Sequence, residues 1–137
     1  MVRSYLVTAA LILALSAPAS AQSVKAGIEA WQRSDYAAAV AIWRPLAEKG
    51  DADASFNLGQ AYRLGRGVPT NLSIAKSWFE RAARQNHVDA QTTLGLVLWT
   101  AGKKAEALAA FEKAAAAGGA GGQVAHTWSL YGKREAV

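Results

Sequence analysis

The middle of the chain decides the fold, where residues 53–84 read DASFNLGQAYRLGRGVPTNLSIAKSWFERAAR. Ala54, Leu58 and Tyr62 recur every four residues, which places their side chains on one face of an α-helix. The segment 63–69 is rich in residues that break helices. A second helical pattern then covers residues 71–84, with apolar side chains at Ile74, Ala75, Trp78, Phe79 and Ala82. The stretch therefore predicts a helix, a turn and a second helix.

The same unit recurs on both sides of this stretch. Asp53-Ala54 and Leu58-Gly59 return 36 residues later as Asp89-Ala90 and Leu94-Gly95. A spacing of 68 residues joins the first unit to the third, in the pairs Gly27 and Gly95, Trp31 and Trp99, Ala39 and Ala107, Trp43 and Phe111, Ala47 and Ala115, and Gly50 and Gly118. Sequence repeats of this length predict helical pairs that bury their apolar faces by stacking on their neighbours.

We predict an all-α fold: an alpha-alpha superhelix, or short solenoid, of about three helix-turn-helix repeats. The marker glycines of these units are Gly27, Gly59 and Gly95, and the last two are expected to permit the closest contact where helices cross. The four-residue difference in unit length falls in the turn at residues 63–69, so the units differ in their loops and not in their helices.

Helix ends are also predicted by particular residues. Asp35 is expected to cap the second helix of the first unit, and Gly50 to end it. Thr70 or Asn71 can cap the second helix of the middle unit. Pro45 lies inside a predicted helix, where its missing amide hydrogen is expected to produce a kink.

The first 21 residues have the three parts of a secretory signal. Arg3 supplies a positive start, residues 5–15 are largely apolar, and Ala19-Ser20-Ala21 supplies small residues before a cleavage site. The apolar run is about half of the roughly 20 residues that a membrane-spanning helix needs. We therefore predict a cleaved signal peptide over residues 1–21, and export of the remainder to the periplasm or to the medium without a spanning segment.

The repeat pattern fades in residues 119–137. Residues 118–122 are too rich in glycine for a good helix start, and His126-Thr127 stands where leucine-glycine would recur, although Tyr131 matches Trp99 at the 32-residue spacing. Two interpretations stay open: a degenerate helix over residues 123–135 that caps the stack, or a tail truncated relative to longer relatives. The predicted domains are a signal peptide (1–21), a repeat domain (22–118) and a degenerate partial repeat or truncated tail (119–137).

These residues resemble the Sel-one-like repeat, a longer-looped relative of the tetratricopeptide repeat. The family pattern is matched in order by Ala54, Leu58-Gly59, Tyr62, Gly65-Arg66-Gly67-Val68, Ala75, Trp78-Phe79 and Ala82-Ala83. The flanking units, with short turns at residues 34–35 and 101–104, are more similar to plain tetratricopeptide repeats. The resemblance covers residues 24–118 and implies a binding module whose concave surface is lined by the first helix of each unit.

In this repeat type the groove-facing positions lie three before, one after and four after the marker glycine. Here they are Val24, Ile28 and Trp31; Phe56, Gln60 and Arg63; and Thr92, Leu96 and Trp99. Tryptophan and arginine contribute much of the binding energy at protein interfaces. We hypothesise that this face receives a segment of another protein, with Arg63 pairing with a carboxylate. The alternative is that Trp31 and Trp99 pack against a following helix as core residues.

No motif for catalysis or metal binding is found in the sequence. The chain has no cysteine, and its two histidines are not at ligand spacing. Asp53 and Asp89 hold the same repeat position near a helix start, where we expect them to satisfy exposed amides and the helix dipole rather than to form a catalytic cluster. The serines lie in no nucleophile motif. The sequence therefore predicts no enzyme, no metal and no cofactor.

The net charge of +5 comes from basic residues that are scattered along the chain. Nucleic-acid binders concentrate such charge on one face, so we expect no nucleic-acid partner. We predict a scaffold or adaptor in a bacterial periplasm or cell envelope that binds another protein or peptide segment. A second hypothesis is a cell-wall module that binds peptidoglycan by stacking Trp31 and Trp99 on sugars. A third is a fragment of a longer repeat protein.

Overall fold

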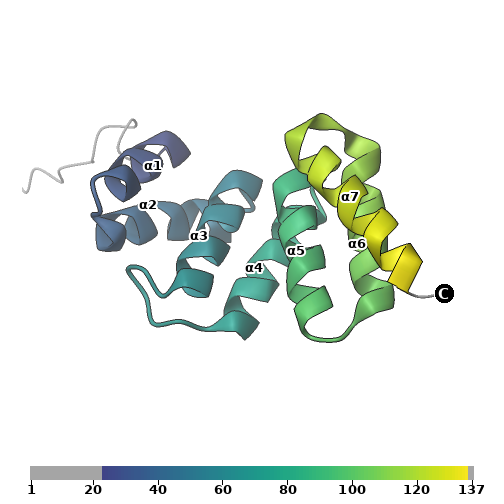
Figure 1. Ribbon diagram of the computed structural model, residues 1–137. Helices are drawn as coiled ribbons and strands as arrows, with labels where there is room; N and C mark the ends of the chain where they lie inside the picture. The colour runs from purple at the N-terminus through teal and green to yellow at the C-terminus, as the bar shows by residue number, and fades with distance from the viewer. Residues whose placement is uncertain (1–22, 136–137) are drawn as a thin grey trace, which may run out of the picture.

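The computed structural model describes residues 23–135 and shows seven α-helices in this range and no strand (Figure 1). They are α1 (Val24–Gln32), α2 (Tyr36–Glu48), α3 (Ala52–Leu64), α4 (Leu72–Ala83), α5 (Val88–Thr100), α6 (Lys104–Ala117) and α7 (Gly119–Glu135). The predicted all-α class is confirmed. The predicted signal peptide, residues 1–21, lies outside the described residues. Within residues 23–135, no helix combines the length and the apolar character that crossing a bilayer requires.

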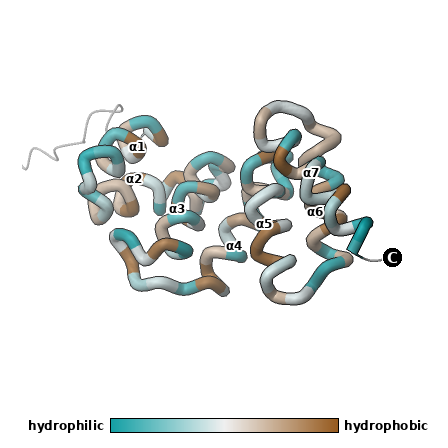
Figure 2. Tube along the Cα trace, in the orientation of Figure 1, coloured by the Kyte–Doolittle hydropathy of each residue, from teal (hydrophilic) through white to brown (hydrophobic). Residues whose placement is uncertain are grey.

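The helices stack as a solenoid of successive pairs. Each helix packs against its neighbours along the chain, and α7 packs against both α6 and α5. Figure 1 shows the stack running from α1 and α2 at one end to α6 and α7 at the other. The second half of α5 is mainly apolar, with Leu94, Leu96, Val97 and Leu98, and α4, α6 and α7 all pack against the helix (Figure 2). The predicted alpha-alpha superhelix is confirmed.

Within each repeat, the marker glycine lies against an aromatic side chain of the second helix. A Cβ atom at any of the three positions would come within 3.0 Å of that ring, so an alanine there would force the two helices apart. The rings themselves are almost fully buried. The glycine and aromatic pairs are Gly27 with Trp43, Gly59 with Phe79, and Gly95 with Phe111.

Two of the predicted helix caps are confirmed. The Asp35 carboxylate accepts a hydrogen bond from the Ala38 amide at 3.2 Å, at the start of α2. The Asn71 side chain, rather than that of Thr70, accepts from the Ile74 amide at 2.9 Å and caps α4. Each acceptor satisfies one of the amides that have no partner inside the helix.

Of the two roles predicted for the repeat-related aspartates, the helix-dipole position is found and the capping of amides is not. Asp51 caps α3, accepting from the Ala54 amide at 2.8 Å, and His87 caps α5 through its Nδ1 atom. Asp53 and Asp89 stand in the first turn, two residues further on, where the positive end of the helix dipole favours a carboxylate. A capping side chain must reach the amide three residues ahead, so a residue inside the first turn cannot serve.

Helix α2 continues through Pro45, which is exposed to solvent. The helix ends as predicted at Gly50, which follows the terminal Lys49 with a positive φ of 97°. A glycine adopts this left-handed conformation without the steric cost of a Cβ atom.

The glycine-rich segment begins a helix, contrary to the prediction that it would start one poorly. Helix α7 starts at Gly119, four residues before the predicted start. Its buried face consists of small residues, Gly122, Ala125, Ser129 and Gly132. A Cβ atom at Gly122 would lie 2.9 Å from the Ala114 carbonyl oxygen, so the glycine allows the backbone of α7 to approach α6. Packing of this face outweighs the low helix propensity of glycine.

The apolar core consists of three clusters along the stack. The first lies in the N-terminal half around Trp43 and Leu58, and the third lies in the C-terminal half around Leu98 and Phe111. Between them is a small cluster of Ala82, Ala83 and Ala90, with Phe56 and Leu94 partly buried against it. We call this middle group the alanine cluster. It joins the two larger cores with little buried apolar volume.

Candidate functional site

Cavities open between successive first helices of the repeats. One lies between α1 and α3, one between α3 and α5, and two between α5 and α7 that use residues of both helices. We call the surface formed by α1, α3, α5 and α7 the groove face. It includes the first helix of each repeat, to which the sequence prediction assigned the binding residues.

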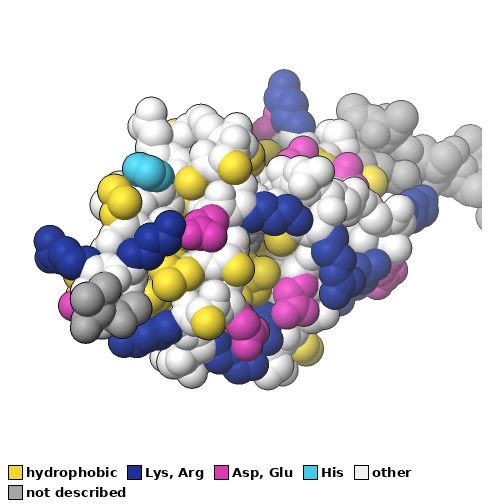
Figure 3. All heavy atoms as spheres, turned by 90° about the vertical axis from the view of Figure 1, so that its right-hand side faces the viewer, with side chains coloured by type: hydrophobic (Ala, Val, Ile, Leu, Met, Phe, Trp, Pro, Cys, Tyr) yellow, Lys and Arg dark blue, Asp and Glu magenta, His cyan; other side chains and the backbone are white. Residues whose placement is uncertain are grey.

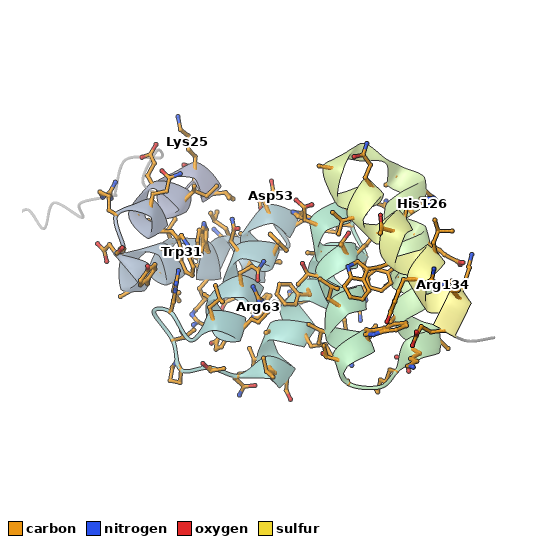
Figure 4. The ribbon with its side chains drawn as sticks, in the orientation of Figure 1. Lys25, Trp31, Asp53, Arg63, His126 and Arg134 are labelled. Carbon is orange, nitrogen blue, oxygen red and sulfur yellow. The ribbon has the colours of Figure 1, made fainter. Side chains whose placement is uncertain are left out.

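The cavity between α1 and α3 has a volume of about 360 Å³ and brings together five of the seven predicted site residues. Residues near the end of α1 and the end of α3, including the labelled Trp31 and Arg63, contribute to its walls (Figure 4). We call this cavity the main groove. It is lined by Ile28, Trp31, Trp43, Phe56, Asn57, Gln60, Arg63 and Leu64.

Three of these lining residues were missed by the sequence reasoning. Asn57 and Leu64 follow predicted groove residues directly in the sequence, and rotation of the helix brings both to the same cavity. Trp43 comes from the second helix, and its indole nitrogen donates to the Val24 carbonyl oxygen at 3.1 Å. The pairing of Trp43 with the marker Gly27 is the sequence feature that could have identified Trp43 as a lining residue.

Polar groups of the main groove are arranged on one helix face of α3. Arg63 Nε donates to Gln60 Oε1 at 2.7 Å, which fixes the guanidinium beside the cavity and leaves its terminal nitrogens available. Arg63 is the charged residue among the lining side chains. Ile28 is 40% exposed and Leu64 is 44% exposed, so the groove combines apolar surface with one cation.

Trp31 is half-buried and contributes to the N-terminal core as well as to the main groove. Its ring lies 4.7 Å from the ring of Tyr36, edge to face, and 5.5 Å from that of Trp43. The Arg66 guanidinium lies 5.8 Å from the centre of the Trp31 ring and 5.1 Å from that of Tyr36. Trp31 therefore lines the groove, as one interpretation of the sequence expected, and also packs in the core, as the other expected.

Leu96 lies in the next cavity, which has a volume of about 340 Å³ between α3 and α5. Gln60 and Arg63 line this cavity as well as the main groove. The two cavities therefore share the wall that Gln60 and Arg63 form on α3. Together they extend across the first helices α1, α3 and α5. The sequence placed Leu96 on this face but did not indicate the neighbouring Thr93 and Val97.

Trp99 lies apart from the main groove. It lines a cavity of about 440 Å³ with Thr127, Trp128 and Tyr131 of α7. Tyr131 could have been found from the sequence, because it stands 32 residues after Trp99, the shorter of the two unit lengths. The remaining groove positions are less accessible: Thr92 is buried with its hydroxyl 3.1 Å from the Gly121 carbonyl oxygen, and Val24 is half-buried against the N-terminal core.

His87 is a positioning residue that the sequence reasoning did not identify. Its Nδ1 atom accepts from the Ala90 amide at 3.1 Å, and its Nε2 atom lies 3.0 Å from Asp53 Oδ1. The imidazole also stacks on the Phe56 ring, with 4.8 Å between centres. His87 therefore supports a wall of the main groove. Among the described residues, no cluster of three or more histidine, aspartate or glutamate side chains could hold a metal ion.

Comparison with known proteins identifies repeat families. The family model described as Tetratricopeptide repeat matches residues 24–67 and 71–121, and the one described as Sel1 repeat matches residues 52–87. A solved structure of a protective antigen from uropathogenic Escherichia coli, displaying an SLR fold, superposes with a TM-score of 0.76 at 25% identity. A Sel1 repeat protein from Oxalobacter formigenes superposes with a TM-score of 0.63 at 30% identity.

These relatives are longer than this chain. The match covers 87% of the chain and 26% of the Escherichia coli protein, and 76% of the chain and 46% of the Oxalobacter formigenes protein. An F-box protein from Arabidopsis thaliana is 37% identical over 75 residues, which is 55% of this chain and 21% of that protein. The chain thus spans less than half the length of each.

Proposed function

The chain belongs to the tetratricopeptide-repeat family of protein-interaction modules, and from this membership we propose that it is an adaptor that holds a segment of another protein on its groove face. The segment lies in the main groove between α1 and α3 and continues past Arg63 toward Leu96. In this account the chain positions its partner and performs no chemistry.

The observation that supports this proposal most strongly is the composition of the main groove. Exposed apolar side chains at Ile28 and Leu64 border a cavity that is wide enough for a side chain, and Arg63 stands beside it. Exposed apolar surface of this kind usually marks a partner site. A bound segment would place an apolar side chain in the cavity and a carboxylate against the Arg63 guanidinium.

The proposed compartment is the periplasm or another part of the cell envelope. It rests on the signal-like residues 1–21, and a chain without cysteine suits a compartment in which thiols are oxidised. Mass spectrometry of the protein from its own host tests this: an N-terminus at Gln22 in the envelope fraction is expected. Full-length chain that stays in the cytoplasm would contradict export.

We do not propose peptidoglycan binding through Trp31. The ring of Trp31 packs against Tyr36, Trp43 and Arg66, which leaves little of its faces for a sugar.

Site-specific crosslinking in the host tests the adaptor proposal. A photoreactive amino acid at Asn57, which lines the main groove, is compared with the same amino acid at Lys113, an exposed position on α6. We expect a discrete crosslinked protein from Asn57 that disappears when Arg63→Glu is added, and none from Lys113. Equal crosslinking from both positions, or none from Asn57, would contradict the proposal.

A further inference from the structure

Three aromatic rings meet between α5 and α7, outside the main groove. The ring centre of Trp99 lies 6.2 Å from that of Trp128 and 6.1 Å from that of Tyr131, and the last two lie 5.9 Å apart. The rings border the cavity of about 440 Å³, and Tyr131 is 44% exposed. We call Trp99, Trp128 and Tyr131 the aromatic site.

The rings of this site are fixed by packing beneath them. Trp128 stacks on the fully buried Phe111, with 5.9 Å between centres and 19° between planes. Gly132 lets α7 approach α5, since a Cβ atom there would lie 2.8 Å from Trp99 Cζ3. A site whose side chains are held before binding loses little conformational entropy when a ligand enters.

The aromatic site has two basic neighbours and one acidic neighbour. Lys104 Nζ lies 5.3 Å from the centre of the Trp99 ring. Arg134 and Glu135 stand three and four residues after Tyr131 on α7, and among the described residues Arg134 makes no ion pair, whereas Lys133 is paired with Glu112 at 2.6 Å. Figure 3 shows this end of the molecule, where Lys and Arg side chains, together with Asp and Glu side chains, border apolar ones.

These charges select among the ligands that aromatic rings bind. A quaternary or methylated ammonium group would be attracted by three rings, but Lys104 and Arg134 would repel it. A neutral apolar side chain would pack favourably against the rings and would not be repelled by the two cations. Acidic residues beside it would be attracted to both cations, which outnumber the neighbouring Glu135.

We propose that the aromatic site is a second docking point on the groove face, which takes an aliphatic or aromatic side chain from an acidic polypeptide segment. The apolar side chain enters between the rings, and flanking Asp or Glu residues meet Lys104 and Arg134. This inference rests on the proposed function in that the groove face binds polypeptide, and it names the chemistry of the segment that reaches the C-terminal end.

The test follows the indole N–H signals of the tryptophans by NMR in the whole chain labelled with nitrogen-15. The probe is an acetylated pentapeptide with a central phenylalanine and two aspartates on each side. Matched peptides replace the phenylalanine with alanine, or the aspartates with lysines. We expect the acidic phenylalanine peptide alone to shift the signals of Trp99 and Trp128, and the shift to weaken as salt is raised.

Reversal of single charges tests whether the acidic peptide binds at the aromatic site or is attracted to the positively charged protein in general. Arg134→Glu is expected to weaken binding of the acidic peptide about fivefold, because it replaces an attraction with a repulsion near the surface. Lys113→Glu, which makes the same change of charge on the outer side of α6, is expected to leave binding unchanged. Tyr131→Ala tests the rings in the same way and is expected to reduce the shifts.

Several outcomes would overturn the inference. Equal shifts with the lysine peptide or the alanine peptide would show that acidity or the apolar side chain is not recognised. Shifts of Trp99 and Trp128 with a soluble peptidoglycan disaccharide, and none with the peptide, would assign the site to a sugar instead. Shifts confined to Trp31 would leave the main groove and the proposed function standing while this inference fails. Failure of crosslinking from Asn57 would contradict the proposed function by itself.

Discussion

His87 shows how one side chain joins two repeats. Its Nδ1 atom caps α5 while its Nε2 atom reaches Asp53 in the first turn of α3, so the ring needs the neutral form with hydrogen on Nε2 to serve both partners. The sequence pattern placed His87 in a turn but could not identify these partners. The histidine is close to the helix start in sequence, whereas its contacts with Asp53 and Phe56 depend on how the repeats stack.

Substitutions at His87 distinguish its role as the cap of α5 from its contacts with Asp53 and Phe56. His87→Asn keeps a capping acceptor and loses the contact with Asp53 and the stacking on Phe56. We expect His87→Asn to lower the free energy of unfolding by about 1 kcal/mol, because the ring stacking is lost, and His87→Ala to lower it by about 2 kcal/mol, because the cap is lost as well. Urea unfolding followed by circular dichroism measures both. Equal losses would mean that the cap is not the main contribution of His87.

The marker glycines are the residues whose role the sequence predicted best. The expected close crossing at Gly59 is confirmed by the Phe79 ring, and a Cβ atom would lie 2.7 Å from its Cε1 atom. We expect Gly59→Ala to destabilise the protein by about 1–3 kcal/mol through overpacking, although alanine favours helices. Urea unfolding provides the measurement, with Ser77→Ala on the exposed side of α4 as the control. A stabilised Gly59→Ala variant would show that the helices can separate without cost.

Among the elements, the helices of the three full units could be predicted from periodicity and breakers, and α7 could not be predicted in its full length. Periodicity depends on residues within one helix, which the middle of the chain supplies clearly. Helix α7 depends instead on small residues such as Gly122 and Gly132 that fit against α5 and α6. Helix propensity penalises those glycines, and their benefit is visible only in the packed structure.

Pro45 gives a test of how α2 is stabilised. It has no amide hydrogen to donate to the Ala41 carbonyl four residues earlier, and both residues are exposed. We expect Pro45→Ala to raise the free energy of unfolding by about 1–3 kcal/mol, because the missing hydrogen bond forms and the ring no longer crowds the preceding turn. Thermal unfolding checks this against Pro69→Ala in the loop before α4, which is expected to give no gain. A loss of stability in Pro45→Ala would mean that its ring packs favourably in α2.

At the scale of the whole molecule, the stack contains two large cores joined by the alanine cluster. Ala82 and Ala90 are fully buried there, but their side chains provide little apolar volume. The stability of a repeat stack is approximately a sum of units and the interfaces between neighbours. The coupling of the two halves therefore depends on a close fit at this interface.

Overpacking of the alanine cluster is expected to uncouple the unfolding of the N-terminal half from that of the C-terminal half. In the unaltered chain, fluorine signals from fluorotryptophan at Trp43 and Trp128 are expected to report one common unfolding midpoint in urea. Ala90→Leu places a larger side chain where the alanine is fully buried, and the two midpoints are then expected to differ. Ala105→Leu, at an exposed position of α6, is the control. Coincident midpoints in Ala90→Leu would show that the halves are coupled in another way.

The sequence also predicted most of the main groove. The repeat register placed Ile28, Trp31, Phe56, Gln60 and Arg63 on one face, because equivalent positions of stacked repeats point in the same direction. For Trp99 the sequence left open that it packs against a following helix, and Trp99 lies with residues of α7. The sequence could not decide between the two interpretations, since the position of that helix follows from tertiary packing.

The most direct test of the adaptor proposal is the affinity for the segment that crosslinks to Asn57, measured by titration calorimetry with two matched charge reversals. Arg63→Glu changes the cation of the main groove, and Arg84→Glu makes the same change at the exposed end of α4. We predict that Arg63→Glu weakens binding about tenfold or more and that Arg84→Glu leaves it unchanged. Equal affinities for both variants, or a loss with Arg84→Glu alone, would contradict binding at the main groove.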